Sequence, residues 1–175
     1  MAKSINSLTN WAGTTLLAAA LSCTFVVSAN AQVDHMAEYK KSATKVYESS
    51  VRSNMRTLQV AAIGYSIDHD GKYPVAVDNA FKSFFMGGKE DNKTPGKQLF
   101  NPFTNTDFWP VTGKPSDVAI LRKGQPFAIA PGNIIYMPIN NGKDFAIVGG
   151  GANGQPITER NSSKRMILDS SAMRD

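Results

Sequence analysis

Cysteine and histidine are scarce in this chain of 175 residues. It contains one cysteine, Cys23, and two histidines, His35 and His69. A disulfide within the chain needs two cysteines, and transition-metal sites are usually built from several Cys and His ligands. The composition therefore excludes an internal disulfide and offers few ligands for a metal, so a hydrophobic core must stabilise the fold. We predict no metal and no cofactor.

The N-terminal region lacks an apolar run of ordinary membrane-helix length. Its apolar stretch, residues 14–27, is shorter than the roughly 20 residues that span a bilayer. A lysine precedes the stretch, and the small residues Ala29 and Ala31 follow it before Gln32. This order is typical of a secretory signal peptide. We predict a signal peptide over residues 1–31, cleaved between Ala31 and Gln32.

Export follows from this prediction. The mature protein would be residues 32–175, in the periplasm or secreted, with no stable membrane span after cleavage. Two alternatives stay open. An uncleaved segment would form a short membrane anchor, and Cys23, after Ala20-Leu21-Ser22, is a loose match to a lipidation site.

Proline is absent between residues 34 and 69, and Gly64 is the only glycine there. Apolar side chains recur at steps of three or four, which is helical spacing. They are Val51, Met55, Leu58, Ala62 and Tyr65, with Tyr47 one turn earlier. Asp70-Gly71 and then Pro74 provide a stop. We predict a long helix over residues 34–70 that lies on a sheet, with its other faces in water. Those faces carry Glu48, Arg52, Ser53, Arg56 and Gln59.

The region between helix and sheet, residues 75–125, contains three phenylalanines at helical spacing. Phe81, Phe84 and Phe85 share one face of a predicted second helix over residues 79–86. They would cap the core, and the alternative is a patch that binds a partner. Residues 98–125 contain three X-Pro pairs and are predicted to be extended and turn-rich.

The final third alternates in the manner of strands. We predict an antiparallel meander over residues 126–158, with a hairpin turn at Asn141-Gly142. Its strands are expected at residues 126–130, 133–139, 143–148 and 155–158, and Gly149-Gly150-Gly151 is expected to be a loop. Residues 159–175 form a polar tail. A helix followed by strands predicts an α+β fold, with the long helix packed on a three- or four-stranded antiparallel sheet.

Three stretches resemble type IV pilins and the pseudopilins of type II secretion. Residues 48–74 are similar to the second half of the pilin helix and the turn that closes it. Asn101-Pro102-Phe103-Thr104 is similar to the turn before the pilin sheet, and residues 132–154 resemble the pilin hairpin and its glycine-rich exit. The resemblance implies a pilin-like domain over residues 32–175. It also implies protein partners, such as components of a pilus or a secretion system.

The N-terminus departs from the pilin pattern. Pilins begin with Gly and Phe, then Glu five residues on, and continue with about 20 apolar residues. Here Gly13 is followed by Thr14, and Ala18 stands in place of the glutamate. A Sec-type signal peptide thus replaces the prepilin N-terminus. Major pseudopilins bind calcium near the chain's end, but residues 149–158 contain no Asp or Glu, so calcium is not predicted.

The sequence contains no catalytic motif that we could identify. Asp68-His69-Asp70-Gly71 lacks the later acidic ligands of a calcium loop, and no Gly-x-Ser-x-Gly elbow is present. Residues 149–154 are rich in glycine but have no lysine for a phosphate site. We predict a protein that is not an enzyme.

Basic residues are densest in the first half of the predicted helix. They are Lys40, Lys41, Lys45, Arg52 and Arg56. A solvated helix face explains them most simply, and a site for DNA or another polyanion is the alternative. Our main hypothesis is an exported pilin-like protein that acts through protein–protein contacts. A polyanion-binding module and an uncleaved filament subunit are the alternatives.

Overall fold

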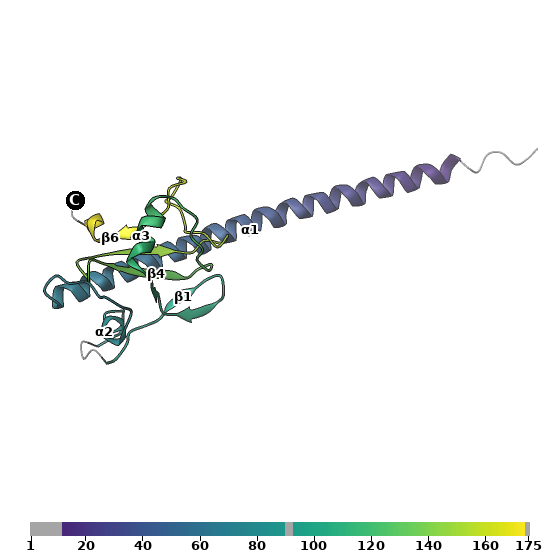
Figure 1. Cartoon of the computed structure of the whole chain (residues 1–175). Coiled ribbons are helices and arrows are strands. Elements are labelled where there is room, and N and C mark those ends of the chain that lie inside the picture. The colour runs from purple at the N-terminus through teal and green to yellow at the C-terminus, as the bar shows by residue number, and fades with distance from the viewer. Residues whose placement is uncertain (1–11, 90–92, 174–175) are drawn as a thin grey trace, which may run out of the picture. The chain divides into compact units, whose positions relative to one another are not determined.

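The computed structural model describes the backbone of residues 12–89 and 93–173, and the side chains of residues 35–89 and 93–171. The chain divides into two compact units, residues 1–43 and 44–175, which are described separately. Figure 1 shows the helices and strands of the α+β fold. They are α1 (Ala12–Asp68), α2 (Asn79–Lys82), β1 (Leu99–Asn101), β2 (Thr106–Phe108), β3 (Val111–Thr112), α3 (Pro115–Arg122), β4 (Ile134–Ile139), β5 (Asp144–Gly149), β6 (Leu168–Asp169) and a 3-10 helix (Ser170–Met173).

The first unit contains the beginning of α1. This helix starts at Ala12 and not near Asp34 as predicted, because the Ala- and Leu-rich residues before Asp34 are themselves good helix formers. The predicted cleavage residues Ala29, Ala31 and Gln32 therefore have helical backbone, and their side chains lie outside the described residues. Among the described residues, no helix has the length and hydropathy of a membrane span. The signal peptide stays a prediction.

In the second unit, the predicted apolar stripe of α1 forms one side of the core. Val51, Met55, Leu58 and Ala62 are fully buried and belong to the same hydrophobic cluster as Tyr136 of β4 and Phe145 and Ile147 of β5. The helix therefore lies on a sheet, as its periodicity predicted. The predicted stop is also confirmed, because Asp70 and Gly71 take positive φ angles of 53° and 77° and the Gly71 N–H donates to the Ser66 carbonyl oxygen at 2.8 Å.

The main sheet has the strand order β3-β4-β5-β6. β4 and β5 form the predicted antiparallel hairpin, from Ile134 opposite Gly149 to Ile139 opposite Asp144. β6 adds to β5 antiparallel, whereas β3 pairs with β4 in parallel, so the sheet is mixed and not the predicted antiparallel meander. A separate two-stranded antiparallel sheet joins β1 and β2.

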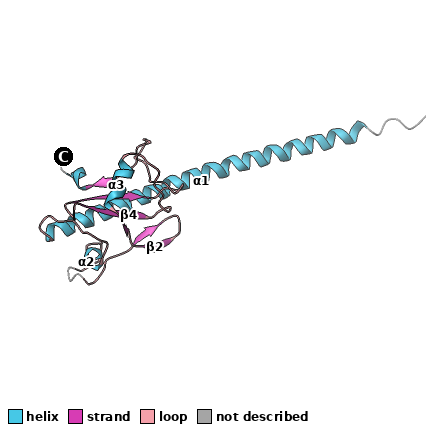
Figure 2. Ribbon diagram, viewed as in Figure 1, coloured by secondary structure: helices cyan, strands magenta, loops and turns pink. Residues whose placement is uncertain are grey.

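Several predicted boundaries were wrong. Residues 98–125 are extended and turn-rich only in their first part, which contains β1, β2 and β3, whereas Pro115–Arg122 forms the helix α3, which was not predicted (Figure 2). Pro115 begins α3, since its fixed φ and missing N–H suit the first turn of a helix. Residues 126–130 form no strand, and residues 155–158 contribute only isolated bridges. The tail supplies β6 instead.

Gly149 and Gly150 do not form the predicted loop. Both are closely packed positions at the end of β5. Gly149 ends β5, and a Cβ atom there would lie 2.6 Å from Val51 Cγ1 of α1. A Cβ on Gly150 would lie 2.2 Å from the Ala130 carbonyl oxygen. The glycines permit close approach of neighbouring backbone and helix side chains.

The phenylalanines of the second helix lie in the core as predicted, and the burial of two of them argues against the alternative of a partner patch. α2 is one turn long and starts with an N-cap, in which the Phe81 N–H donates to Asp78 Oδ1 at 2.9 Å. Phe81 is fully buried and Phe85 is 3% exposed, so neither can contact a partner. Phe84 is partly buried, and its ring centre lies 5.2 Å from that of Tyr65. The three rings serve the core.

Candidate functional site: a basic groove beside α1

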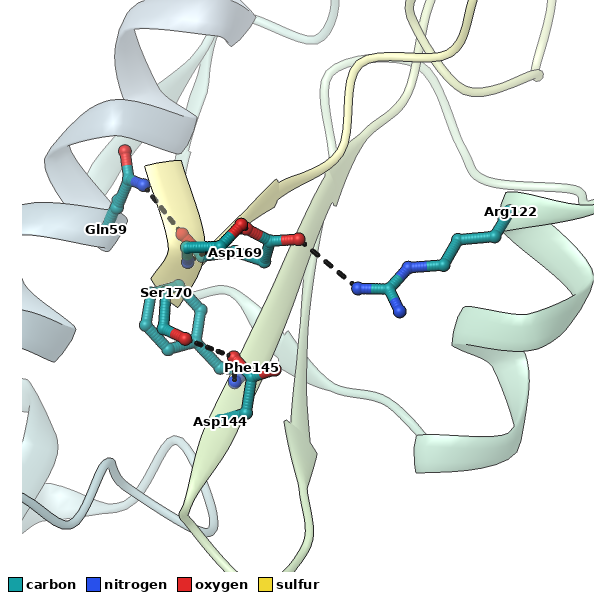
Figure 3. Close-up of polar contacts among 7 residues, drawn as sticks. Gln59, Arg122, Asp144, Phe145, Asp169 and Ser170 are labelled. Atoms are coloured by element: carbon teal, nitrogen blue, oxygen red, sulfur yellow. Dashed lines mark hydrogen bonds and ion pairs between the residues drawn. The ribbon is translucent and has the colours of Figure 1, made fainter. Parts of the chain in front are cut away.

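The side of α1 that was predicted to face water is partly covered by the end of the chain. Arg52 donates to the Thr158 carbonyl oxygen from Nη2 at 2.9 Å and from Nε at 3.3 Å. Gln59 is only 7% exposed, and its Nε2 donates to the Asp169 carbonyl oxygen at 3.1 Å (Figure 3). The prediction that both side chains are solvated was therefore wrong. We call residues 158–171 the C-terminal segment.

The C-terminal segment is fastened to the sheet as well as to the helix. Ser170 donates its hydroxyl to Asp144 Oδ1 at 2.6 Å, and Arg122 Nη2 of α3 lies 3.2 Å from Asp169 Oδ2 (Figure 3). β6, within this segment, pairs Leu168 with Ile147 and Asp169 with Ala146 of β5. These contacts hold the segment at both the sheet and α1.

A groove of about 1200 Å³ lies between α1 and the C-terminal segment. We call it the basic groove. One side consists of Lys45, Glu48, Ser49, Arg52, Ser53 and Arg56 from α1. The other side consists of residues 158–163 and 166–168. All of these residues belong to the second unit.

The groove carries an excess of positive charge. Its two acidic side chains are paired, Glu48 with Arg52 at 3.7 Å and Glu159 with Lys164 at 3.5 Å. Lys45, Arg56 and Arg160 form no salt bridge within the described part of the chain. Three unpaired cations therefore line the groove, and an anionic ligand would reduce their mutual repulsion.

The structure brings together part of the predicted polyanion site. Lys45, Arg52 and Arg56 line the groove, but Arg52 is already bonded to the C-terminal segment. Lys40 and Lys41 are exposed residues of the first unit and are not part of the groove. Sequence reasoning missed Arg160, because it stands alone in a polar stretch with no periodicity to connect it to α1. Polyanion binding stays a prediction.

A second surface of α1 is apolar and exposed. Val46, Val60 and Ile67 are 65%, 62% and 75% exposed. An α-helix turns by about 100° per residue. On this basis the three side chains leave the helix axis within about 60° of one another, on the side opposite the buried stripe. Ser49, Ser53 and Thr57 lie on the same side between Val46 and Val60, so the three exposed apolar residues are separate and not a continuous stripe. We call these three apolar residues the exposed apolar face of α1, the other face being the buried stripe.

Two tyrosines that pack in or against the core have raised pKa values. Burial raises the pKa of Tyr136 strongly, and nearby Tyr73, Asp144 and Tyr65 raise it further. Burial, followed by the charge of Asp78, raises the pKa of Tyr65. His69 stacks on Tyr65 with ring centres 3.7 Å apart, and its Nδ1 lies 2.8 Å from the Tyr65 carbonyl oxygen. Among the described residues, no three His, Cys, Asp or Glu side chains group as metal ligands.

Comparison of the chain with protein-family models, with curated proteins and with solved structures found no match.

Proposed function

We propose that this chain is an exported pilin- or pseudopilin-like protein that binds other proteins and is not an enzyme. The exposed apolar face of α1 is the observation that carries the proposal. Val60 and Ile67 gain nothing from water, and the helix that presents them is already fixed to the sheet through its opposite face. A partner that packs along this side of the helix would remove these apolar side chains from water, which makes the face a candidate contact site.

The order of elements supports the pilin-like part of the proposal. A long helix comes first, its buried stripe lies on an antiparallel hairpin, and that hairpin ends in closely packed glycines. These features occupy the stretches, residues 48–74 and 132–154, that resemble pilins. Components of a pilus or a type II secretion system are the partners we propose, in the periplasm or outside the cell.

The export part is tested by the mature N-terminus of the protein from its native host. Intact mass and terminal peptide mapping should give a start at Gln32, because signal peptidase reads the small residues at Ala29 and Ala31. A start at Thr14 or an uncut chain would contradict cleavage between Ala31 and Gln32. Either result would favour the alternative of a filament subunit.

The contact part is tested by a photo-crosslinking amino acid at Val60 or at Ile67, in the native host. Both positions should capture the same protein, since they lie on one face of one helix. Val75 is the matched control, because it is also an exposed valine but follows α1. Equal capture of that protein at Val75, or no capture at Val60 and Ile67, would contradict a contact through this face.

A further inference from the structure

We propose that the basic groove binds an extended acidic peptide segment that also carries aliphatic side chains. This inference rests on the proposed function, because it names the chemistry of a protein segment that the chain would bind. The α1 residues that line the groove end at Arg56, whereas Val60 and Ile67 lie further along the helix, so these two positions can be tested separately from the groove.

The charges of the groove select an acidic ligand. Lys45 and Arg56 line it from the helix, and Arg160 lines it from the C-terminal segment. Both groove carboxylates are engaged by other basic side chains, so they do not neutralise these three. An arginine can hold a carboxylate through two parallel hydrogen bonds, which makes Arg56 and Arg160 the strongest contacts we expect.

The uncharged lining favours a peptide over a nucleic acid. Met166 is buried, Ile167 and Leu168 are half-buried, and all three line the groove. Proteins that bind single-stranded nucleic acid stack bases on aromatic side chains, and no residue that lines this groove is aromatic. Met166 is already part of the core, but aliphatic side chains of a peptide would bury the parts of Ile167 and Leu168 that are still exposed, whereas a sugar–phosphate chain would leave them in contact with water.

The C-terminal segment, which forms one side of the groove, is fixed in place without a ligand. The bonds of Arg52 to Thr158 and of Ser170 to Asp144 fix the C-terminal segment on either side of its groove-lining residues. A preformed site does not have to be ordered by its ligand, which lowers the cost of binding. Ser49, Ser53 and Asn161 add hydrogen-bonding groups for a peptide backbone.

The test is fluorescence anisotropy of the full chain with defined probes. The first probe is a labelled peptide of glutamate and leucine interspersed with serine. Matched peptides carry lysine in place of glutamate or serine in place of leucine. Oligothymidylate and a heparin oligosaccharide represent the polyanions. We expect the Glu/Leu peptide to bind about tenfold more tightly than every other probe.

The test variant is Arg56→Glu with Arg160→Glu, and the control is Lys123→Glu with Lys143→Glu. The control makes the same change of charge at exposed lysines outside the groove. We expect the test variant to weaken binding of the Glu/Leu peptide about tenfold or more, and the control to leave it nearly unchanged. Circular dichroism of both variants confirms that they are folded.

Three outcomes would overturn the inference: no binding of the Glu/Leu peptide, equal weakening by both variants, or tighter binding of oligothymidylate or heparin. The last would assign the groove to a polyanion. Crosslinking from Val60 separates the two proposals. If the peptide fails while Val60 still captures its protein, only the groove inference is wrong. Loss of the Val60 capture would count against the proposed function itself.

Discussion

Tyr136 is a fully buried side chain whose hydroxyl donates to the Pro74 carbonyl oxygen at 2.8 Å. Burial raises its pKa, so the native protein holds the phenol neutral at pH values where the unfolded chain releases the proton. Because the pKa is raised in the folded state, this contribution to stability is fully present below the unfolded pKa of about 10. It is lost as the pH rises above that value.

The variant Tyr136→Phe should test this argument. At pH 8 we expect it to lower the free energy of unfolding by about 1–2 kcal/mol, because the buried Pro74 oxygen loses its donor. Above pH 10 the free energy of unfolding of the wild-type protein should fall relative to that of the variant by up to about 1.4 kcal/mol per pH unit. The variant does not show this loss because phenylalanine cannot ionise. Urea unfolding of both proteins from pH 8 to 11 measures the difference. A gap that does not change with pH would show that Tyr136 does not govern alkaline stability.

Arg52 and Arg56 are a matched pair on one side of α1 with different expected effects. Arg52→Met removes two hydrogen bonds to the Thr158 oxygen and should cost about 1.5 kcal/mol of unfolding free energy. Arg56→Met removes no such bond and should change stability by less than about 0.5 kcal/mol. Urea unfolding measures both. Equal values for the two variants would mean that the Thr158 contact contributes nothing.

Sequence reasoning could not separate these two arginines. Both stand on the polar side of the helical pattern, and the partner of Arg52 lies 106 residues away. The same holds for Gln59, whose acceptor lies 110 residues away. Periodicity reports which residues share a face, but it does not report what covers that face.

Among the elements, β6 is a very short strand that side-chain contacts hold in place more than its own backbone hydrogen bonds do. It contributes two residues to the sheet, Leu168 and Asp169. Gln59 of α1 donates to the Asp169 carbonyl oxygen, and Asp144 of β5 accepts from Ser170, the residue that follows β6 (Figure 3). A strand this short has few backbone hydrogen bonds of its own, so we expect these two contacts, together with the Arg122–Asp169 ion pair, to hold it in place.

Combined substitution of Gln59→Ala and Ser170→Ala should therefore loosen the C-terminal segment. Each lost hydrogen bond costs about 1 kcal/mol, so local opening should become roughly 30-fold more frequent. Hydrogen exchange of the peptides that cover residues 166–171 measures this opening. Lys164→Ala is the control, because its exposed ion pair with Glu159 contributes little. Unchanged exchange in the double variant would show that β6 is held by other contacts.

Local signals predicted some elements well and others poorly. The helix stripe, the glycine stop and the β4–β5 hairpin follow from short-range patterns, and the structure contains them. β1, β2, β3 and α3 escaped prediction because they are at most eight residues long and are bounded by prolines. Pro115 can begin a helix as readily as it can make a turn, and only the packing of Val118 and Leu121 in the core decides between them.

In the molecule as a whole, the buried side chains that stabilise the described part of the chain belong to the second unit, residues 44–175. Every buried side chain in the described part of the chain lies at Val51 or later. The described side chains of residues 35–43 are nearly all exposed. An exposed helical stretch without tertiary packing adds little to the stability of a domain.

A chain that starts at Thr44 should therefore unfold with a free energy within about 1 kcal/mol of one that starts at Gln32. A chain that starts at Leu58 is the control, since it loses the fully buried Val51 and Met55 and should not fold stably. Urea unfolding followed by circular dichroism compares the three. If the Thr44 chain is as unstable as the Leu58 chain, residues 32–43 must pack on the domain.

The sequence by itself determined the class of fold, the inward face of α1, its capped end and the main hairpin, because each depends on residues a few positions apart. Only the tertiary structure decided that Gln59 is covered by the end of the chain and that Arg160 joins Arg56 in one groove. It also decided that the polar tail completes the sheet. The physical reason is that burial and charge pairing depend on which distant segments meet, and local spacing does not encode that choice.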